Sequence, residues 1–242
     1  MPAADKPPLK HFLRSVCFPE LTEKSKYFSL LQLRELLVHR DVPAASATLL
    51  QYLHEAVAEG VIHRAGRGWF SSLATPFELN REPVRDLAST LENRFPLLEF
   101  SCWSTAQIAG YGHHLLGRFV AFAHTERDSM ESVAGALRVA GWSAFLNPTQ
   151  QEVTKSFRVT EKTVVVRPAV SRAPVDGKFA SVEKLLVDLH VESTALQLMD
   201  AGEYQRIVAN LAGSARISVG TLAQYAERRS QRVEDVLPGI IK

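Results

Sequence analysis

The stretch from Tyr27 to Ser71 constrains the fold of this 242-residue chain more than any other feature. From its second residue it reads FSLLQLRELL, then, after four more residues, VPAASATLLQYLHEAVAEG, and then VIHRAGRGWFS. Ser29 and Gln32 form a capping-box pattern at the start of a helix, and Gly60 stands where a glycine ends one. Two short runs flank Ala65-Gly66-Arg67-Gly68, whose glycines suit a hairpin loop. Two helices, a turn and a hairpin in this order predict a winged helix-turn-helix.

The second helix of this motif is the one expected to enter the major groove of DNA. At about 100° per residue, one face is expected to pack inward: Ser46, Leu49, Leu50, Leu53, Ala56 and Val57. The opposite face is expected to point outward: Ala44, Ala47, Thr48, Gln51 and Glu55. Thr48 and Gln51 are the expected base contacts, because Gln pairs with adenine and Thr reaches a base edge or a thymine methyl. Ala44 and Ala47 are small enough to allow close approach.

The hairpin carries His63, Arg64 and Arg67, with no carboxylate between Val61 and Phe70. Such a wing can place a guanidinium group on phosphate or in a narrow minor groove. The formal net charge of the whole chain is only +2. That charge argues against a non-specific DNA coater and favours a monomer or DNA-induced dimer that reads inverted repeats in an operator. The alternative is a winged helix that serves as a protein-interaction module.

Composition indicates an ordinary water-soluble protein, with 46% hydrophobic and 22% charged residues. Cys17 and Cys102 are the only cysteines and lack a CxxC spacing, so neither a disulfide framework nor a structural zinc site is expected. No apolar run approaches the ~20 residues that span a bilayer. The opening residues MPAADKPPLK lack an apolar signal-peptide region, so we expect a short flexible lead and a cytoplasmic protein.

Three prolines punctuate the chain after the hairpin, at Pro76, Pro83 and Pro96. We therefore expect a winged helix-turn-helix domain over residues 1–80, a linker helix over 81–96 and an α/β domain over 97–242, the two domains having independent cores. Ser104 and Gln107 form a second capping-box pattern. Strands are expected over Leu97–Trp103, Phe119–Ala123, Trp142–Leu146 and Thr163–Arg167. Helices are expected over Thr125–Ala140, Ser181–Glu192, Tyr204–Leu211 and Thr221–Arg229. The predicted fold class is α+β, a mixed α/β C-terminal domain with a helical end following the winged helix.

Motifs of common enzyme classes are missing: the sequence has no GxxxxGK[ST], GxGxxG after a strand, HExxH or GxSxG. His113 and His114 are adjacent, so their side chains diverge and a shared metal is not expected. His124 ends a strand before a helix, where a packing role is favoured over an active-site role. Gly213-Ser214 is similar to the start of a nucleotidyltransferase motif, but no Asp-x-Asp follows it. We expect no catalytic residue, no metal and no cofactor.

Lys184 and Asp188 are the most distinctive pair of the second half, four residues apart on an expected helix. They can form an ion pair along one helix face, which contributes a few tenths of a kcal/mol when exposed. Alternatively, the charged pair marks a functional surface of the C-terminal domain.

Three segments, SVEKLLVDLHVES (Ser181–Ser193), EYQRIVANL (Glu203–Leu211) and VGTLAQYAERR (Val219–Arg229), follow the winged-helix pattern. In this combination, from Tyr27 to about Arg229, the chain resembles the AbiEi family of bacterial antitoxins. The resemblance implies a transcriptional autorepressor that binds operator DNA and an antitoxin half that counters a co-encoded nucleotidyltransferase-like toxin, without a stable complex being assumed. A winged-helix regulator whose α/β domain senses a small ligand, and a winged-helix enzyme, are the alternatives. A polar-lined pocket would favour the first alternative, and converging carboxylates or histidines the second.

Overall fold

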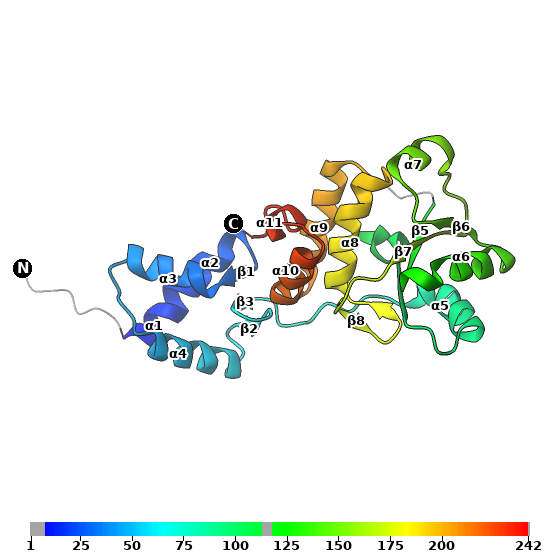
Figure 1. Ribbon diagram of the computed structural model, residues 1–242. Coiled ribbons are helices and arrows are strands. Elements are labelled where there is room, and N and C mark those ends of the chain that lie inside the picture. The colour runs from blue at the N-terminus through cyan, green and yellow to red at the C-terminus, as the bar shows by residue number, and fades with distance from the viewer. Residues whose placement is uncertain (1–7, 113–117, 242) are drawn as a thin grey trace, which may run out of the picture.

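A computed structural model describes residues 8–112 and 118–241. Within them, the chain forms an α+β fold with eleven α-helices and two β-sheets. The molecule is elongated, with the N-terminal helices at one end and the larger sheet at the other (Figure 1). Helices α9 (Ala201–Ser214), α10 (Val219–Arg228) and α11 (Val233–Val236) lie between these ends. The C-terminal helices, which belong to the second predicted domain, therefore lie next to the N-terminal region.

The N-terminal region begins with a helical stretch that the sequence analysis did not predict. It comprises α1 (Leu9–Phe12), a π-helical turn η1 (Leu13–Cys17) and α2 (Phe18–Lys24). Leu9 and Lys10 are thus helical, which corrects the expectation of a flexible lead at these two positions, and the first seven residues lie outside the described part. Pro19 conceals the helix in the sequence because prolines interrupt helices, but here it occupies the first turn of α2, where its missing N–H costs nothing.

The remaining elements of this region follow the predicted order. They are β1 (Tyr27–Ser29), α3 (Leu30–His39), α4 (Ser46–Ala58), β2 (His63–Arg64) and β3 (Trp69–Ser71). The three strands form an antiparallel sheet in the order β1-β3-β2. The capping box is confirmed: Ser29 Oγ accepts from the Gln32 amide at 3.1 Å and Gln32 Oε1 accepts from the Ser29 amide at 2.7 Å. Gly60, Gly66 and Gly68 all have positive φ, as a helix end and a tight hairpin require.

The larger sheet has six strands in the order β6-β7-β5-β4-β9-β8. The strands are β4 (Phe100–Ser104), β5 (Val120–Thr125), β6 (Ser143–Leu146), β7 (Thr163–Pro168), β8 (Val175–Asp176) and β9 (Phe179–Ala180). Strands β5, β6 and β7 are parallel, whereas β4 runs antiparallel to β5. Short helices connect them: η2 (Thr105–Tyr111), η3 (Arg127–Ser129) and α7 (Gln150–Ser156). The four predicted strands of this region are confirmed, while β8, β9 and α7 were not predicted.

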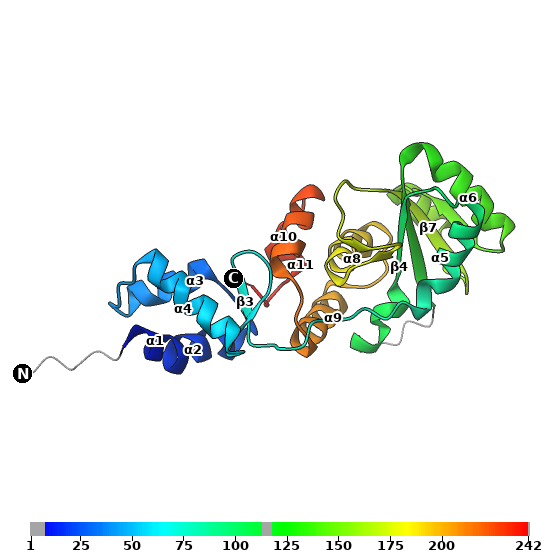
Figure 2. The same ribbon diagram turned by 90° about the horizontal axis from the view of Figure 1, so that it is seen from below.

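Helices cover both faces of this sheet (Figures 1 and 2). On one face lie α5 (Glu82–Arg94) and α6 (Met130–Val139), and on the other lies α8 (Val182–Ala195). Side chains of β5 alternate accordingly, because successive residues of a strand point to opposite faces. Ala121 and Ala123 belong to the core under α5 and α6, and Val120 and Phe122 to the core under α8.

The segment 81–96 is not a linker helix, which corrects the predicted domain division. Val84, Leu87, Ala88 and Leu91 of α5 are buried in one core with β4, β5 and α6. The apolar face that identified this segment as a helix therefore packs onto the sheet. The connection is instead the strand-free stretch between β3 and α5, which runs past α9 and α10 (Figure 2).

The two regions share part of one core. Tyr27 of β1 and Ala65 of the hairpin are 2% and 1% exposed, and both belong to the hydrophobic cluster built around α8, α9 and α10. The independent cores expected from the proline-punctuated sequence are thus joined at the hairpin. None of the helices within residues 8–112 and 118–241 combines the length and the apolar composition needed to cross a membrane.

Candidate functional site

The outward face of α4 differs from the predicted one. Leu50 was expected to pack inward, yet its side chain is 50% exposed. Thr48, expected to point outward, is half-buried. Ser46, also expected to pack inward, is exposed as well, and the exposed residues of α4 are Ser46, Ala47, Leu50, Gln51, His54 and Ala58. Of the expected DNA-contacting residues, Ala47 and Gln51 are therefore exposed, Thr48 is half-buried, and Ala44 is half-buried and precedes α4.

The helical stretch α1–η1–α2, which was not predicted, explains why the exposed face of α4 differs from the predicted one. Lys10 Nζ lies 2.6 Å from Glu55 Oε2 and 3.5 Å from Glu59 Oε1, and Arg14 forms an ion pair with Glu59. These cations cover the side of α4 that carries Glu55, so the buried sector extends toward Thr48. The charges of two carboxylates at the C-terminal end of α4 are thereby balanced, and the hydrogen bond from Lys10 lowers the pKa of Glu55. Glu55 was expected to remain in solvent, and its side chain is 32% exposed and paired with Lys10.

The hairpin presents its arginines to solvent. Arg64 and Arg67 are exposed and make no ion pair with another described residue, while His63 is half-buried. Between them Ala65 is only 1% exposed, because it faces the C-terminal helices. The structure therefore keeps two uncompensated positive charges on a hairpin adjacent to the end of α4.

A second candidate site lies inside the C-terminal region, where α8 carries charged residues at successive turns. Lys184, Asp188 and Glu192 are 1%, 0% and 2% exposed. The predicted pair between Lys184 and Asp188 is confirmed, but both groups are buried. The alternative hypothesis, that these two residues mark a functional surface, is therefore wrong. The burial of these charged residues could not be seen in the sequence, because it depends on the packing of α8 between the sheet on one side and α9 and α10 on the other.

Strands and α10 supply the partners of these charges. Tyr225 donates to Asp188 Oδ1 at 3.0 Å, and Arg229 Nε lies 3.4 Å from the same oxygen. His124 Nε2 lies 3.5 Å from Asp188 Oδ2. Arg167, at the end of β7, binds Glu192 through two hydrogen bonds of 3.0 and 2.6 Å. We call these seven residues the buried charge cluster: His124, Arg167, Lys184, Asp188, Glu192, Tyr225 and Arg229.

The cluster is a closed ionic network. Burial opposes ionisation of Asp188, but the neighbouring positive charges, that of Lys184 first, together outweigh it and lower the pKa of Asp188. Burial and then the charge of Lys184 lower the pKa of His124 to about 3, so its imidazole is neutral. Carboxylates and a histidine do converge here, as a winged-helix enzyme would require. Each carboxylate is held by cations, however, and within the described residues no group of three His, Cys, Asp or Glu side chains is arranged to hold a metal ion.

One member of the cluster reaches a cavity. His124 lines a pocket of about 680 Å³ at the ends of β5 and β7, and neither of its ring nitrogens has a hydrogen-bond partner among the described residues. Ser101 lies opposite His124 in the β4–β5 register and lines the same pocket. The walls include Val170 and Ala173 from the loop after β7. The position of His124 at a strand end was visible in the sequence, but its burial beside Asp188 was not.

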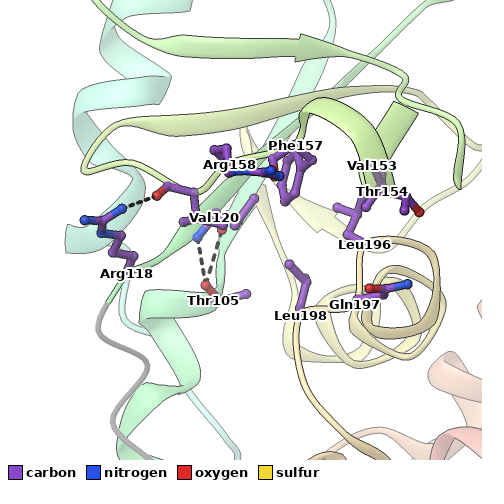
Figure 3. Close-up of a pocket in the computed structure, with 11 residues that line it drawn as sticks. Thr105, Arg118, Val120, Val153, Thr154, Phe157, Arg158, Leu196, Gln197 and Leu198 are labelled. Carbon is purple, nitrogen blue, oxygen red and sulfur yellow. Dashed lines mark hydrogen bonds between the residues drawn. The ribbon is translucent and has the colours of Figure 1, made fainter. Parts of the chain in front are cut away.

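A second pocket of about 340 Å³ lies beside β5 and α7 (Figure 3). Thr105 Oγ1 accepts from the Val120 amide at 3.0 Å on one side, and Arg118 donates to the Val159 carbonyl at 2.8 Å. Apolar side chains of Phe157 and Leu196 line its interior. Its described lining contains no carboxylate, histidine or cysteine, so it offers no acid–base or thiol chemistry. The pair His113 and His114 lies outside the described residues.

Comparison with known proteins gives one match. A family model described as "Family of unknown function (DUF6577)" matches residues 48–237, which include most of α4, the hairpin and nearly all of the second half. No curated protein and no solved structure matches the chain.

Proposed function

We propose that this chain, which belongs to the family of unknown function DUF6577, is a DNA-binding repressor that acts on its own operon. The observation that carries the proposal is the order of elements in the N-terminal region. The helical stretch α1–η1–α2, helices α3 and α4, and the strand order β1-β3-β2 with the β2–β3 hairpin directly after α4 follow the order expected of a winged helix-turn-helix. In that arrangement α4 is the recognition helix and the hairpin is the wing.

The charges of this region support DNA as the partner. Arg64 and Arg67 are exposed and form no ion pair with any residue that the structure describes, so they are available to phosphate. Glu55 and Glu59, which would repel phosphate, are paired with Lys10 and Arg14. Gln51 lies on the exposed face of α4 and can read an adenine edge.

The same proposal gives the second half an antitoxin role toward a co-encoded nucleotidyltransferase-like toxin. Its support is the resemblance of the α8, α9 and α10 segments to AbiEi antitoxins. We propose no catalytic role, because the carboxylates of the buried charge cluster are held by Lys184, Arg167 and Arg229. Rescue of growth by the full chain when the neighbouring toxin gene is induced would support this role, and no rescue at equal expression would contradict it.

The DNA-binding proposal is tested with a duplex from upstream of the gene and a scrambled duplex of equal length. The double variant Arg64→Ala/Arg67→Ala should weaken binding to both duplexes and reduce the slope of log K against log salt by about 2, roughly one for each lost phosphate contact. The charge-matched control is Arg127→Ala/Arg232→Ala, which removes two exposed arginines elsewhere. Equal affinities and slopes for wild type and the hairpin variant would show that the hairpin is not a wing.

A second candidate function is favoured by the pocket beside His124. A regulator that senses a small ligand needs a cavity with a few polar groups, and this pocket of about 680 Å³ is lined by Ser101 and the buried His124. Its walls also carry the charged residues Glu99, Glu126, Arg172 and Lys178. Screening neutral amides and alcohols by their effect on the His124 ring resonances tests this function. Unchanged resonances across such a set would contradict it.

A further inference from the structure

The hairpin and helix α10 pack backbone against backbone. A Cβ atom added to Gly66 would lie 2.7 Å from the Gly220 nitrogen, and one added to Gly220 would lie 2.6 Å from the Arg67 nitrogen. Real Cβ atoms essentially never come closer than 3.0 Å to such atoms. The Gly220 amide also donates a 3.1 Å hydrogen bond to the Ala65 carbonyl. Neither glycine can therefore gain a side chain unless the hairpin or α10 moves.

The strand beside the hairpin is fixed to the same segment. Tyr27 of β1 is paired with Ser71 of β3, and its hydroxyl is buried among the C-terminal helices. That hydroxyl accepts from the Ile217 amide at 3.0 Å and lies 3.0 Å from the carbonyls of Ala212 and Ala215, to either of which it can donate. One side chain thus joins the three-stranded sheet to the turn between α9 and α10.

The chain leaving the hairpin is held there as well. Arg216 donates to the Leu73 carbonyl at 2.8 Å and also to the Ala74 carbonyl, and its own amide donates to the Thr75 carbonyl at 2.8 Å. Strand β1, the hairpin loop and the segment that follows β3 therefore all contact residues 212–220. Strands β2 and β3 have only two and three residues, so we expect these contacts to help fix where the arginines of the hairpin lie.

We propose that Tyr27, Gly66 and Gly220 are positioning residues for DNA binding. Through them, α10 of the second half sets the position of Arg64 and Arg67 relative to α4. This inference rests on the proposed DNA-binding function and assigns part of it to the C-terminal region. The family match is consistent with it, because the matched residues contain the hairpin and α10 together.

The test uses the full chain with Gly220→Ala and, as its matched control, Gly135→Ala. Gly135 also lies in a helix, but a Cβ atom there would meet nothing within 4 Å. In Gly220→Ala we expect faster amide hydrogen exchange in the hairpin with unchanged exchange in α4. Affinity for the upstream duplex should fall about 10-fold, and the salt slope should fall by about 1–2 as phosphate contacts are lost. Gly135→Ala should match wild type in all three measurements.

A second variant, Tyr27→Phe, keeps the ring in the core and removes only the hydroxyl. It should change the same measurements in the same direction, and it decides the question if Gly220→Ala does not fold. Wild-type hairpin exchange together with a wild-type salt slope in the folded variants would overturn the inference. Failure of the wild-type chain to bind any duplex would overturn the proposed function itself, and that failure is seen before any substitution is made.

Discussion

Tyr225 donates a 3.0 Å hydrogen bond to Oδ1 of Asp188, and this contact joins α10 to the charged groups inside α8. The other end of α10 carries Gly220, which packs against the hairpin. One helix of ten residues therefore spans the distance between the buried charge cluster and the proposed DNA-binding region. Substitutions in the buried charge cluster should consequently alter the position of the hairpin, because α10 contacts both.

Asp188→Asn should strongly destabilise the folded chain. The substitution leaves Lys184, which is 1% exposed, without a compensating charge. Breaking a buried ion pair in this way costs about 3–5 kcal/mol of unfolding free energy. Urea denaturation of the full-length protein measures this loss of unfolding free energy. The double variant Lys184→Met/Asp188→Leu should lose less, because it removes both charges and fills the space with apolar side chains. A single variant as stable as wild type would contradict the assignment of Asp188 as the centre of the cluster.

His124 should make stability depend on pH. Burial, followed by the charge of Lys184, lowers the pKa of His124 from 6.5 to about 3. Between these values the unfolded chain binds a proton that the folded chain does not, so stability falls as pH falls below 6.5. The slope from one such group is at most about 1.4 kcal/mol per pH unit.

The measurement is the unfolding free energy of wild type and His124→Gln between about pH 4 and pH 6.5. The variant should show the flatter profile. Burial also lowers the pKa of His190, which contributes in the same direction, so His190→Gln is the matched control and should flatten the profile less. Parallel profiles for wild type and His124→Gln would mean that His124 is not buried in the neutral form.

Gln51→Ala should reduce specificity and leave non-specific binding unchanged. Gln51 is exposed on α4 and donates to Glu55 at 3.2 Å in the free protein, so it must exchange this contact for a base. We expect a loss of about 1–3 kcal/mol in preference at one base pair. Competition between the upstream and the scrambled duplex measures this preference. His54→Ala is the comparison on the same face, further from the N-terminal end of α4, and should have less effect. An equal loss for both duplexes would indicate that Gln51 contacts phosphate.

Local patterns predicted local structure well. The capping boxes at Ser29 and Ser104 are both present, because they depend on residues three positions apart. Thr149 and Glu152 form a third, at the start of α7, whose equally visible pattern was missed. The amphipathic pattern of α5 identified the helix but not the sheet face that it covers.

Non-local packing accounts for what the sequence did not predict. The outward face of α4 depends on Lys10 and Arg14, which come from helices concealed by Pro19. Charged side chains are expected at the surface, so the burial of Asp188 and Glu192 follows only once α8 is known to lie between the sheet and α10. The partners of these residues, His124 and Arg167, come from two different strands, and only the topology brings them together.

The shared core predicts an asymmetry between the two halves when they are separated. The core under α5 and α6 contains no residue before Val84, and the buried charge cluster contains none before His124. A fragment of residues 82–242 should therefore fold, with a loss of about 3–5 kcal/mol because Tyr27 no longer fills its place among the C-terminal helices. A fragment of residues 1–81 should be marginal alone, since a domain of this size buries a small share of its surface and the hairpin loses its support.

Mixing the two fragments should restore the native hairpin. Amide spectra of labelled 1–81 should change toward those of the full chain as 82–242 is added, and residues 63–71 should change most. The same titration with 82–242 carrying Gly220→Ala should need a higher concentration, because the added methyl group would lie 2.6 Å from the Arg67 nitrogen. If residues 1–81 alone already give the hairpin resonances of the full chain, the two halves have independent cores, and the packing of Ala65 against Gly220 is not needed to hold the hairpin.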